Sequence, residues 1–177
     1  MRKSVFGISA SSGMARIPFA AFLLASMGMA NANPLPLPST FDTTIGNGLL
    51  CLDQLDINYY YRYLSAALGK PYKHSEGAYW FKLNKFMLWK IPVSDILVSD
   101  GKENTLFLLA IVNAPPEKLQ MAIAAQSGIH FYREGRGNYP RRASNTGSNI
   151  VYFHNEAKIY CGKSSYLLPQ GEGEPFR

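Results

Sequence analysis

The densest group of chemically capable side chains is a set of four arginines with a tyrosine among them: Arg133, Arg136, Tyr139, Arg141 and Arg142. A guanidinium group binds a carboxylate or phosphate through paired hydrogen bonds and stacks on aromatic rings. Residues 134–149 around this set are rich in Gly, Pro, Asn and Ser, which predicts a long exposed loop. Such a loop could bind an acidic protein, a lipid head group or a cell-wall carboxylate. It could equally be a solvated segment with no ligand.

A second group is aromatic and occupies a predicted pair of strands: Tyr79, Trp80, Phe81, Phe86 and Trp89. Side chains alternate between the two faces of a strand, so these rings cannot all enter one core. We therefore take Trp80 and Trp89 as candidate binding residues on an open face of the sheet, because exposed aromatic rings on a rigid sheet often form binding surfaces. The alternative is that another layer of the protein covers them.

The residues that usually carry catalysis are few. His74, His130 and His154 have no metal-site spacing, and isolated strand and loop histidines are the simpler interpretation. There is no G-x-S-x-G nucleophile motif, and the glycines at 135 and 137 lack the strand–turn–helix context of a phosphate-binding loop. We therefore predict no cofactor and no metal, and we find no catalytic signature.

The two cysteines, Cys51 and Cys161, allow one intramolecular pairing. In an oxidising compartment such a pair usually forms a disulfide. A bond between them would close a loop of about 110 residues and stabilise the fold by about 4–5 kcal/mol through chain entropy. A redox-active pair would more often have the close C-x-x-C spacing.

Residues 1–32 have the pattern of a secretory signal peptide. Arg2 and Lys3 precede an apolar run at 17–29, which is too short to span a bilayer comfortably, and Ala30-Asn31-Ala32 fits the cleavage site. Removal of three cations would lower the net charge from +6 to +3. So small an excess does not favour nucleic-acid binding. We expect a periplasmic or secreted protein with no transmembrane segment in its mature chain.

The mature chain divides into three parts by composition. Residues 33–45 begin with alternating prolines and predict an extended leader. Residues 46–168 are long enough for a single α+β domain, and residues 169–177 predict a flexible tail.

Within the domain, two stretches have the apolar spacing and the terminal glycine of a helix. One runs from Ile57 to Gly69 and the other from Pro115 to Gly128. Buried strands are predicted at 49–52 and 105–112, and a tight turn at Asn84-Lys85 would join two further strands.

The expected fold is an antiparallel sheet of about seven strands with two helices on one face and the other face open. Residues 49–72 align without gaps on residues 108–131, which raises the alternative of a duplicated β-α-β-β unit.

These observations favour a non-catalytic protein that binds another protein in the cell envelope, in the manner of an inhibitor or an immunity protein. Two other functions stay open. One is a small envelope hydrolase whose site is built from scattered residues, and the other is a binder of lipid or cell-wall glycan through the open aromatic face. No single motif decides between them.

Overall fold

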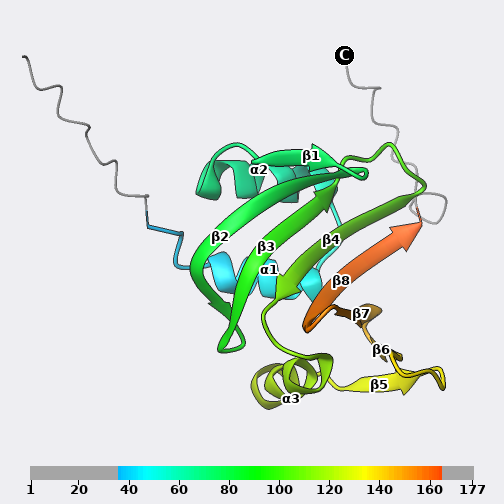
Figure 1. The fold of residues 1–177 in the computed structure, drawn as a ribbon. Helices are drawn as coiled ribbons and strands as arrows, with labels where there is room; N and C mark the ends of the chain where they lie inside the picture. The colour runs from blue at the N-terminus through cyan, green and yellow to red at the C-terminus, as the bar shows by residue number, and fades with distance from the viewer. Residues whose placement is uncertain (1–35, 165–177) are drawn as a thin grey trace, which may run out of the picture. The chain divides into compact units, whose positions relative to one another are not determined.

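The structure is a computed structural model that describes residues 36–164. The signal peptide predicted at 1–32 and the tail predicted at 169–177 lie outside the described residues. Figure 1 shows the order of the elements along the chain. In sequence order they are α1 (Phe41–Leu49), α2 (Ile57–Leu68), β1 (Lys73–Ser75), β2 (Ala78–Leu88), β3 (Ile91–Ser99), β4 (Thr105–Val112), α3 (Pro116–Ser127), β5 (Phe131–Glu134), β6 (Arg141–Ser144), β7 (Ser148–Phe153) and β8 (Glu156–Ser164).

One antiparallel sheet contains all eight described strands in the order β1-β2-β3-β4-β8-β7-β6-β5. The predicted α+β class and antiparallel sheet are therefore confirmed. The sheet has eight strands where about seven were expected, and three helices where two were expected. The missed elements are β1 at one edge of the sheet, β6 beside the strand at the other edge, and the helix α1, none of which has a long apolar pattern.

Helices α2 and α3 form where the apolar spacing placed them. Asp56 caps α2, because its carboxylate accepts the backbone N–H groups of Asn58 and Tyr59 at 2.9 and 3.0 Å. Pro116 occupies the first turn of α3, and Gly128 ends it in the left-handed conformation at φ 72°. No helix within residues 36–164 has the length and apolar character needed to cross a membrane.

The strand predicted at 49–52 is wrong, because this segment is the end of α1 and the turn after it. The predicted extended leader is likewise helical from Phe41 onward. Gly48 in α1 is required for close packing: a Cβ atom at this position would lie 2.3 Å from the Tyr60 hydroxyl and 2.8 Å from a Leu108 methyl group. The glycine therefore lets α1 approach α2 and the sheet closely.

The turn predicted at Asn84-Lys85 is also wrong. β2 continues through these residues with an irregular register between Lys82 and Phe86, and Lys85 has a positive φ of 55°. The chain reverses instead at Trp89-Lys90, between β2 and β3. Asn84 and Lys85 have the composition of a turn, but they form a bulge.

The long loop predicted at 134–149 contains a strand. β6 pairs with β5 on one side and with β7 on the other, which leaves only short turns between them. Strand alternation therefore separates the arginines that the sequence had placed together in one loop.

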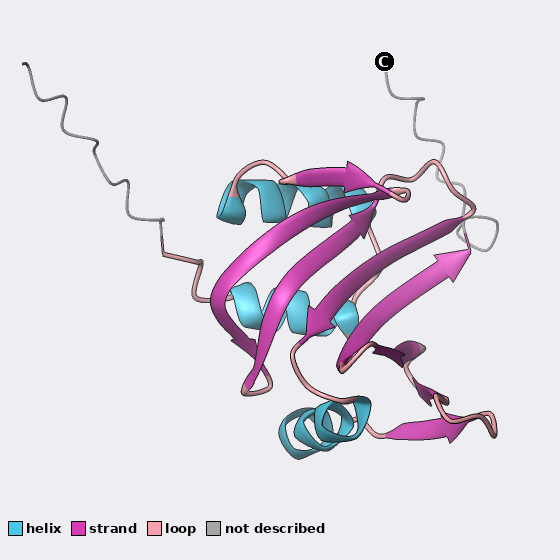
Figure 2. Cartoon of the chain, viewed as in Figure 1, coloured by secondary structure: helices cyan, strands magenta, loops and turns pink. Residues whose placement is uncertain are grey.

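The core lies between the helices and one face of the sheet, which we call the helix-covered face (Figure 2). Strand residues on this face form two rows across the paired strands. One row contains Val98, Leu108, Cys161 and Ser148. The other contains Phe81, Ile96, Ala110, Ile159 and Ile150. Every one of these side chains is buried, and α2 adds Tyr60 and Leu64 while α3 adds Leu119 and Ile123.

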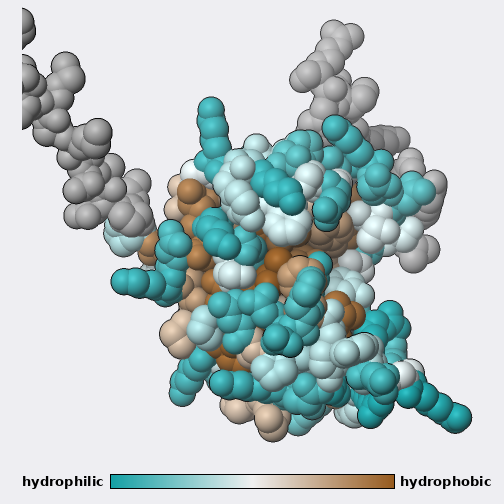
Figure 3. Space-filling view, in the orientation of Figure 1, coloured by the Kyte–Doolittle hydropathy of each residue, from teal (hydrophilic) through white to brown (hydrophobic). Residues whose placement is uncertain are grey.

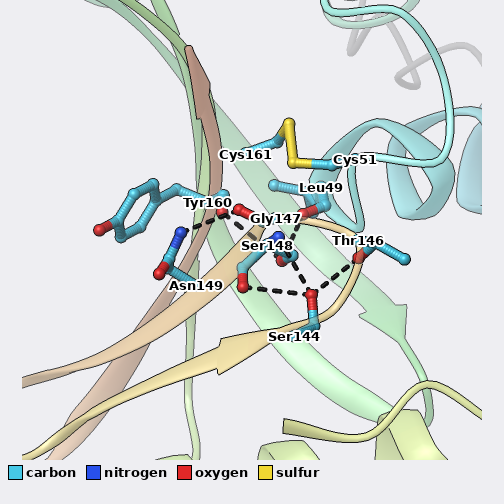
Figure 4. Close-up of a disulfide and its surroundings, with 9 residues drawn as sticks. All are labelled: Leu49, Cys51, Ser144, Thr146, Gly147, Ser148, Asn149, Tyr160 and Cys161. Carbon is cyan, nitrogen blue, oxygen red and sulfur yellow. Dashed lines mark hydrogen bonds between the residues drawn. A yellow bond between two sulfur atoms is a disulfide. The ribbon is translucent and has the colours of Figure 1, made fainter. Parts of the chain in front are cut away.

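The predicted disulfide is confirmed and joins Cys51 to Cys161 (Figure 4). It links the turn after α1 to β8 near the middle of the sheet. A buried hydrogen bond supports the same junction, since the Ser148 hydroxyl donates to the backbone carbonyl of Leu49 at 2.7 Å. The helix layer is thus fastened to the sheet by a covalent bond and a polar contact side by side.

The predicted β-α-β-β repeat does not describe the architecture, because its first strand at 49–52 is absent. The structure contains instead two units of one helix followed by four consecutive strands, α2 with β1–β4 and α3 with β5–β8. Their last strands, β4 and β8, pair at the centre of the sheet. The helices of the two aligned segments, α2 and α3, each come first in one of these larger units.

Candidate functional site

The face of the sheet that points away from the helix core, here called the open face, has a regular arrangement of side chains. One row crosses all eight strands, with one residue from each strand. It contains Lys73, Trp80, Leu97, Leu109, Tyr160, Asn149, Ala143 and Tyr132. A second, parallel row contains Lys82, Asp95, Ile111, Lys158 and Val151.

Seven apolar side chains on this face form a cluster separate from the main core, which we call the open-face cluster: Ala78, Trp80, Leu97, Phe107, Leu109, Ile111 and Phe153. Leu97 and Ile111 are only 5% and 4% exposed although none of the helices α1, α2 and α3 covers them. Their larger neighbours on the sheet shield them and are themselves half-buried. Figure 3 shows the resulting brown apolar surface framed by hydrophilic side chains. A contiguous apolar surface of this kind is typical of a binding site.

Beside the cluster lies a buried carboxylate with two hydrogen-bond donors. The Tyr72 hydroxyl donates to Asp95 at 2.9 Å, and the Lys82 ammonium lies 3.1 and 3.3 Å from the two oxygens of the same carboxylate. Burial of the hydroxyl, followed by its bond to Asp95, raises the pKa of Tyr72 to about 12. Tyr72 therefore stays a neutral donor at physiological pH, and the negative charge of Asp95 is compensated.

Two other lysines lie over aromatic rings at opposite ends of the cluster. The Lys73 ammonium is 4.4 Å from the centre of the Trp80 ring, and that of Lys158 is 3.9 Å from the centre of Phe153. Neither lysine forms a salt bridge within residues 36–164. The apolar surface is thus bounded by positive charge that no carboxylate of the described chain pairs with.

The predicted arginine set is divided between the two faces. Arg141 lies on the open face, where it pairs with the exposed Glu134 of β5. This carboxylate raises the pKa of Arg141 further above its usual range. Arg141 is therefore a solvent-exposed cation at the β5–β6 end of the open face.

Arg142, the next residue, points to the helix-covered face and is only 8% exposed. It pairs with Glu117 of α3, and the Tyr152 hydroxyl donates to the same carboxylate. Tyr152 first, and then Arg142, lower the pKa of Glu117 below its usual value. Arg142 is thus a structural residue that joins α3 to the sheet.

Of the remaining predicted site residues, all except Trp80 lie apart from the open-face cluster. Arg133 donates to the backbone carbonyl of Gly137 within the β5–β6 hairpin, where Arg136 is exposed. Tyr139 packs edge-on against Tyr152. The prediction that Trp89 lies on the open face is wrong, because Trp89 is in the β2–β3 turn and approaches Gly46 of α1. Trp80 lies on the open face, where it was predicted.

The histidines occupy separate places. His74 stacks on Tyr79 and bonds to Asp100 at 2.9 Å, which lowers the pKa of that carboxyl. His130 precedes β5, and His154 packs edge-on against Phe153 in the β7–β8 turn. Among the described residues, no three His, Cys, Asp or Glu side chains are grouped so that they could hold a metal ion.

Sequence reasoning missed most of the open-face cluster. Leu97, Phe107, Leu109 and Ile111 belong to long apolar runs that predict burial on both faces. Asp95 was the residue that could have indicated an open face here. It interrupts its apolar strand and shares a face with Leu97 two residues later.

We compared the chain with known proteins in three ways. No family model matches it, and no match was found among curated proteins or solved structures.

Proposed function

We propose that this protein is an exported, non-catalytic binding protein that holds another protein against the open face of its sheet. The observation that carries the proposal is the open-face cluster, an apolar surface on a sheet whose opposite face is packed by three helices. Export is supported by the signal-peptide pattern of residues 1–32 and by the disulfide. Inhibition of the bound protein, or protection from it, is the action that such a surface would perform.

The charges around the cluster define the chemistry of the bound protein. Lys73 and Lys158 lie at its two ends, and Arg141 lies further along the same face. Glu156 is the acidic side chain of this face that lacks a salt bridge among residues 36–164, and it lies opposite Phe153. We therefore expect the bound protein to present apolar side chains flanked by carboxylates.

The rigidity of the site also supports binding. The Asp95 carboxylate receives bonds from both Tyr72 and Lys82, which fixes the edge of the cluster on β2 and β3. A surface that is ordered before binding loses less conformational entropy when the complex forms. Trp80, with its indole N–H bonded to the Ser75 carbonyl at 3.3 Å, is held in the same way.

The test uses the full chain, expressed with its own signal sequence and a C-terminal tag. Proteins that co-purify from the cell envelope are compared between the wild type, Leu109→Asp and Met121→Asp by quantitative mass spectrometry. Leu109 is half-buried in the open-face cluster, whereas Met121 is 62% exposed on α3. Both variants add one carboxylate, so they match in charge.

We expect at least one envelope protein to be retained by the wild type and by Met121→Asp and to be lost from Leu109→Asp. Its direct binding is then measured with the purified components, and circular dichroism establishes that both variants are folded. The proposal fails if the retained proteins are the same for all three chains, or if nothing is retained.

A further inference from the structure

A cleft of about 460 Å³ lies between α1, the β2–β3 turn and the end of α3. Pockets of this size accommodate small ligands. None of its lining residues belongs to the open-face cluster. It is a separate feature of the molecule, and the protein-binding role proposed above does not use it.

The turn that forms one wall of this cleft has an unfavourable backbone conformation. Trp89 and Lys90 have φ values of 50° and 61°, the left-handed region that two-residue hairpins usually fill with Asn and Gly. A bulky residue in this region is an outlier and costs about 1–3 kcal/mol. Strained residues of this kind cluster at ligand sites. The turn in this conformation places Trp89 at the edge of the cleft.

The lining of the cleft includes an aromatic ring and two exposed apolar side chains. Trp89 approaches α1 at Gly46, where an added Cβ atom would lie 3.7 Å from the ring. Met87 and Leu52 are 51% and 50% exposed on the cleft lining. Exposed apolar side chains next to an aromatic ring provide a contact surface for a ligand with an apolar face.

Asp42, Thr43 and Ser127 of the lining form local hydrogen bonds, but four other polar groups of the lining have no partner in the described part of the chain. Within residues 36–164, no hydrogen bond or ion pair occupies the carboxamide groups of Asn47 and Gln126, the Lys90 ammonium or the Trp89 indole N–H. A carboxamide both donates and accepts hydrogen bonds. Two of them facing one cleft match a ligand whose groups also do both, and hydroxyl groups have this property.

The charges of the lining indicate a neutral ligand. Asp42 contributes one negative charge and Lys90 one positive charge. The cleft therefore has no excess cation to select a phosphate or a carboxylate. An apolar ring face combined with hydroxyl groups and no net charge is the chemistry of a sugar. We propose that the cleft binds a neutral glycan, with one sugar ring stacked on Trp89 and its hydroxyl groups bonded to Asn47 and Gln126.

The experiment screens the full chain on an array of neutral and acidic glycans and titrates the strongest binder by tryptophan fluorescence. The chain contains two tryptophans, so Trp80→Phe leaves Trp89 as the reporter. We expect a neutral glycan to change the fluorescence of Trp80→Phe. We also expect its affinity to fall at least tenfold in Trp89→Ala and in Asn47→Ala/Gln126→Ala.

The Asn47→Ala/Gln126→Ala variant should fold as the wild type does, because alanine is favourable in a helix and neither carboxamide supports the fold. It therefore separates a loss of binding from a loss of folding. Leu109→Asp, on the open face, should bind the glycan as the wild type does. The proposal is overturned if no glycan on the array binds. It is also overturned if an acidic glycan binds best, or if binding survives both cleft variants but is lost in Leu109→Asp.

Discussion

Ile96 and Leu97 are neighbours on β3 and point to opposite faces of the same sheet. Both are almost fully buried, at 0% and 5% exposure. Ile96 is buried by the helices packed over it, whereas Leu97 is buried only by side chains beside it on the sheet. The first kind of burial fills a core. The second leaves an apolar surface that another molecule can reach, so similarly low exposure values conceal different roles.

Charged residues show the same difference between the two faces of the sheet. Arg142 and Arg141 are also neighbours, on β6, and each pairs with a glutamate. The Arg142 side chain is 10% exposed and joins α3 to the sheet, while that of Arg141 is 52% exposed on the open face. Of these two arginines, the one on the helix-covered face therefore supports the structure, and the one on the open face stays accessible to solvent.

The largest expected effect comes from separating the helix layer from the sheet. Cys161 lies on the helix-covered face, and its bond to Cys51 closes a loop of 110 residues. Chain entropy predicts that Cys51→Ala/Cys161→Ala lowers the free energy of unfolding by about 4–5 kcal/mol. Urea denaturation measures it, with reduced wild type as a second form lacking the bond. A loss below about 1 kcal/mol would show that the bond contributes little.

A smaller effect on the free energy of unfolding is expected from truncating Ile96 or Leu97, and it should differ between the two residues. Ile96→Ala leaves a cavity under the helices and should cost about 3–4 kcal/mol, within the usual range for such truncations. Leu97→Ala should cost about half as much, because its neighbours on an uncovered surface can relax and water can enter. Urea denaturation of both variants tests this. An equal or larger loss for Leu97→Ala would contradict the division of the two faces.

How far the sequence predicts this arrangement depends on the range of the interactions involved. Helices α2 and α3 are set by local features, namely the Asp56 cap and the glycines at 69 and 128, and the sequence predicts both. The disulfide follows from there being two cysteines. Helix α1 was missed because Gly48, a residue that is unfavourable inside a helix, is required there by contact with Tyr60 and Leu108 in other elements.

The candidate site shows the same limit. Trp80 was identified because aromatic residues on a strand pair must face both ways. The arginines were grouped by proximity in sequence, but β6 places Arg141 and Arg142 on opposite faces. The open-face cluster depends on the register of several strands, and register is decided by packing across the whole sheet.

The two arginine pairs should differ in their contribution to stability. Glu117→Ala removes the carboxylate from a buried guanidinium and from the Tyr152 hydroxyl, and should cost about 1–3 kcal/mol. Glu134→Ala removes an exposed pair and should cost less than about 1 kcal/mol. Thermal or urea unfolding of the two variants makes the comparison directly. Equal losses would mean that Arg142 does not depend on Glu117.

Lowering the pH should weaken the contact between Arg142 and Glu117. The pKa of Glu117 is lowered in the folded state below its usual 4.5, so its contribution to stability is present above that pH. It is lost as the pH falls through the folded-state pKa, because the protonated carboxyl no longer pairs with Arg142. Glu117→Gln should therefore lose less stability than the wild type below pH 4.5. Urea midpoints at several acidic pH values test this, and parallel curves for the two proteins would refute it.

The smallest effect on stability is expected from the lysines over the open-face cluster. Each cation–π contact at an exposed site contributes about 0.5–1 kcal/mol or less, so Lys73→Gln/Lys158→Gln should fold with nearly unchanged stability. The same variant should slow association with the protein captured through Leu109 and weaken its salt dependence, because charges at the rim of an interface steer encounter. Stopped-flow measurements at low and high salt test both effects. If the variant changed stability but not association, these lysines would support the fold and not binding. The open face would then lack the charge complementarity on which its proposed role rests.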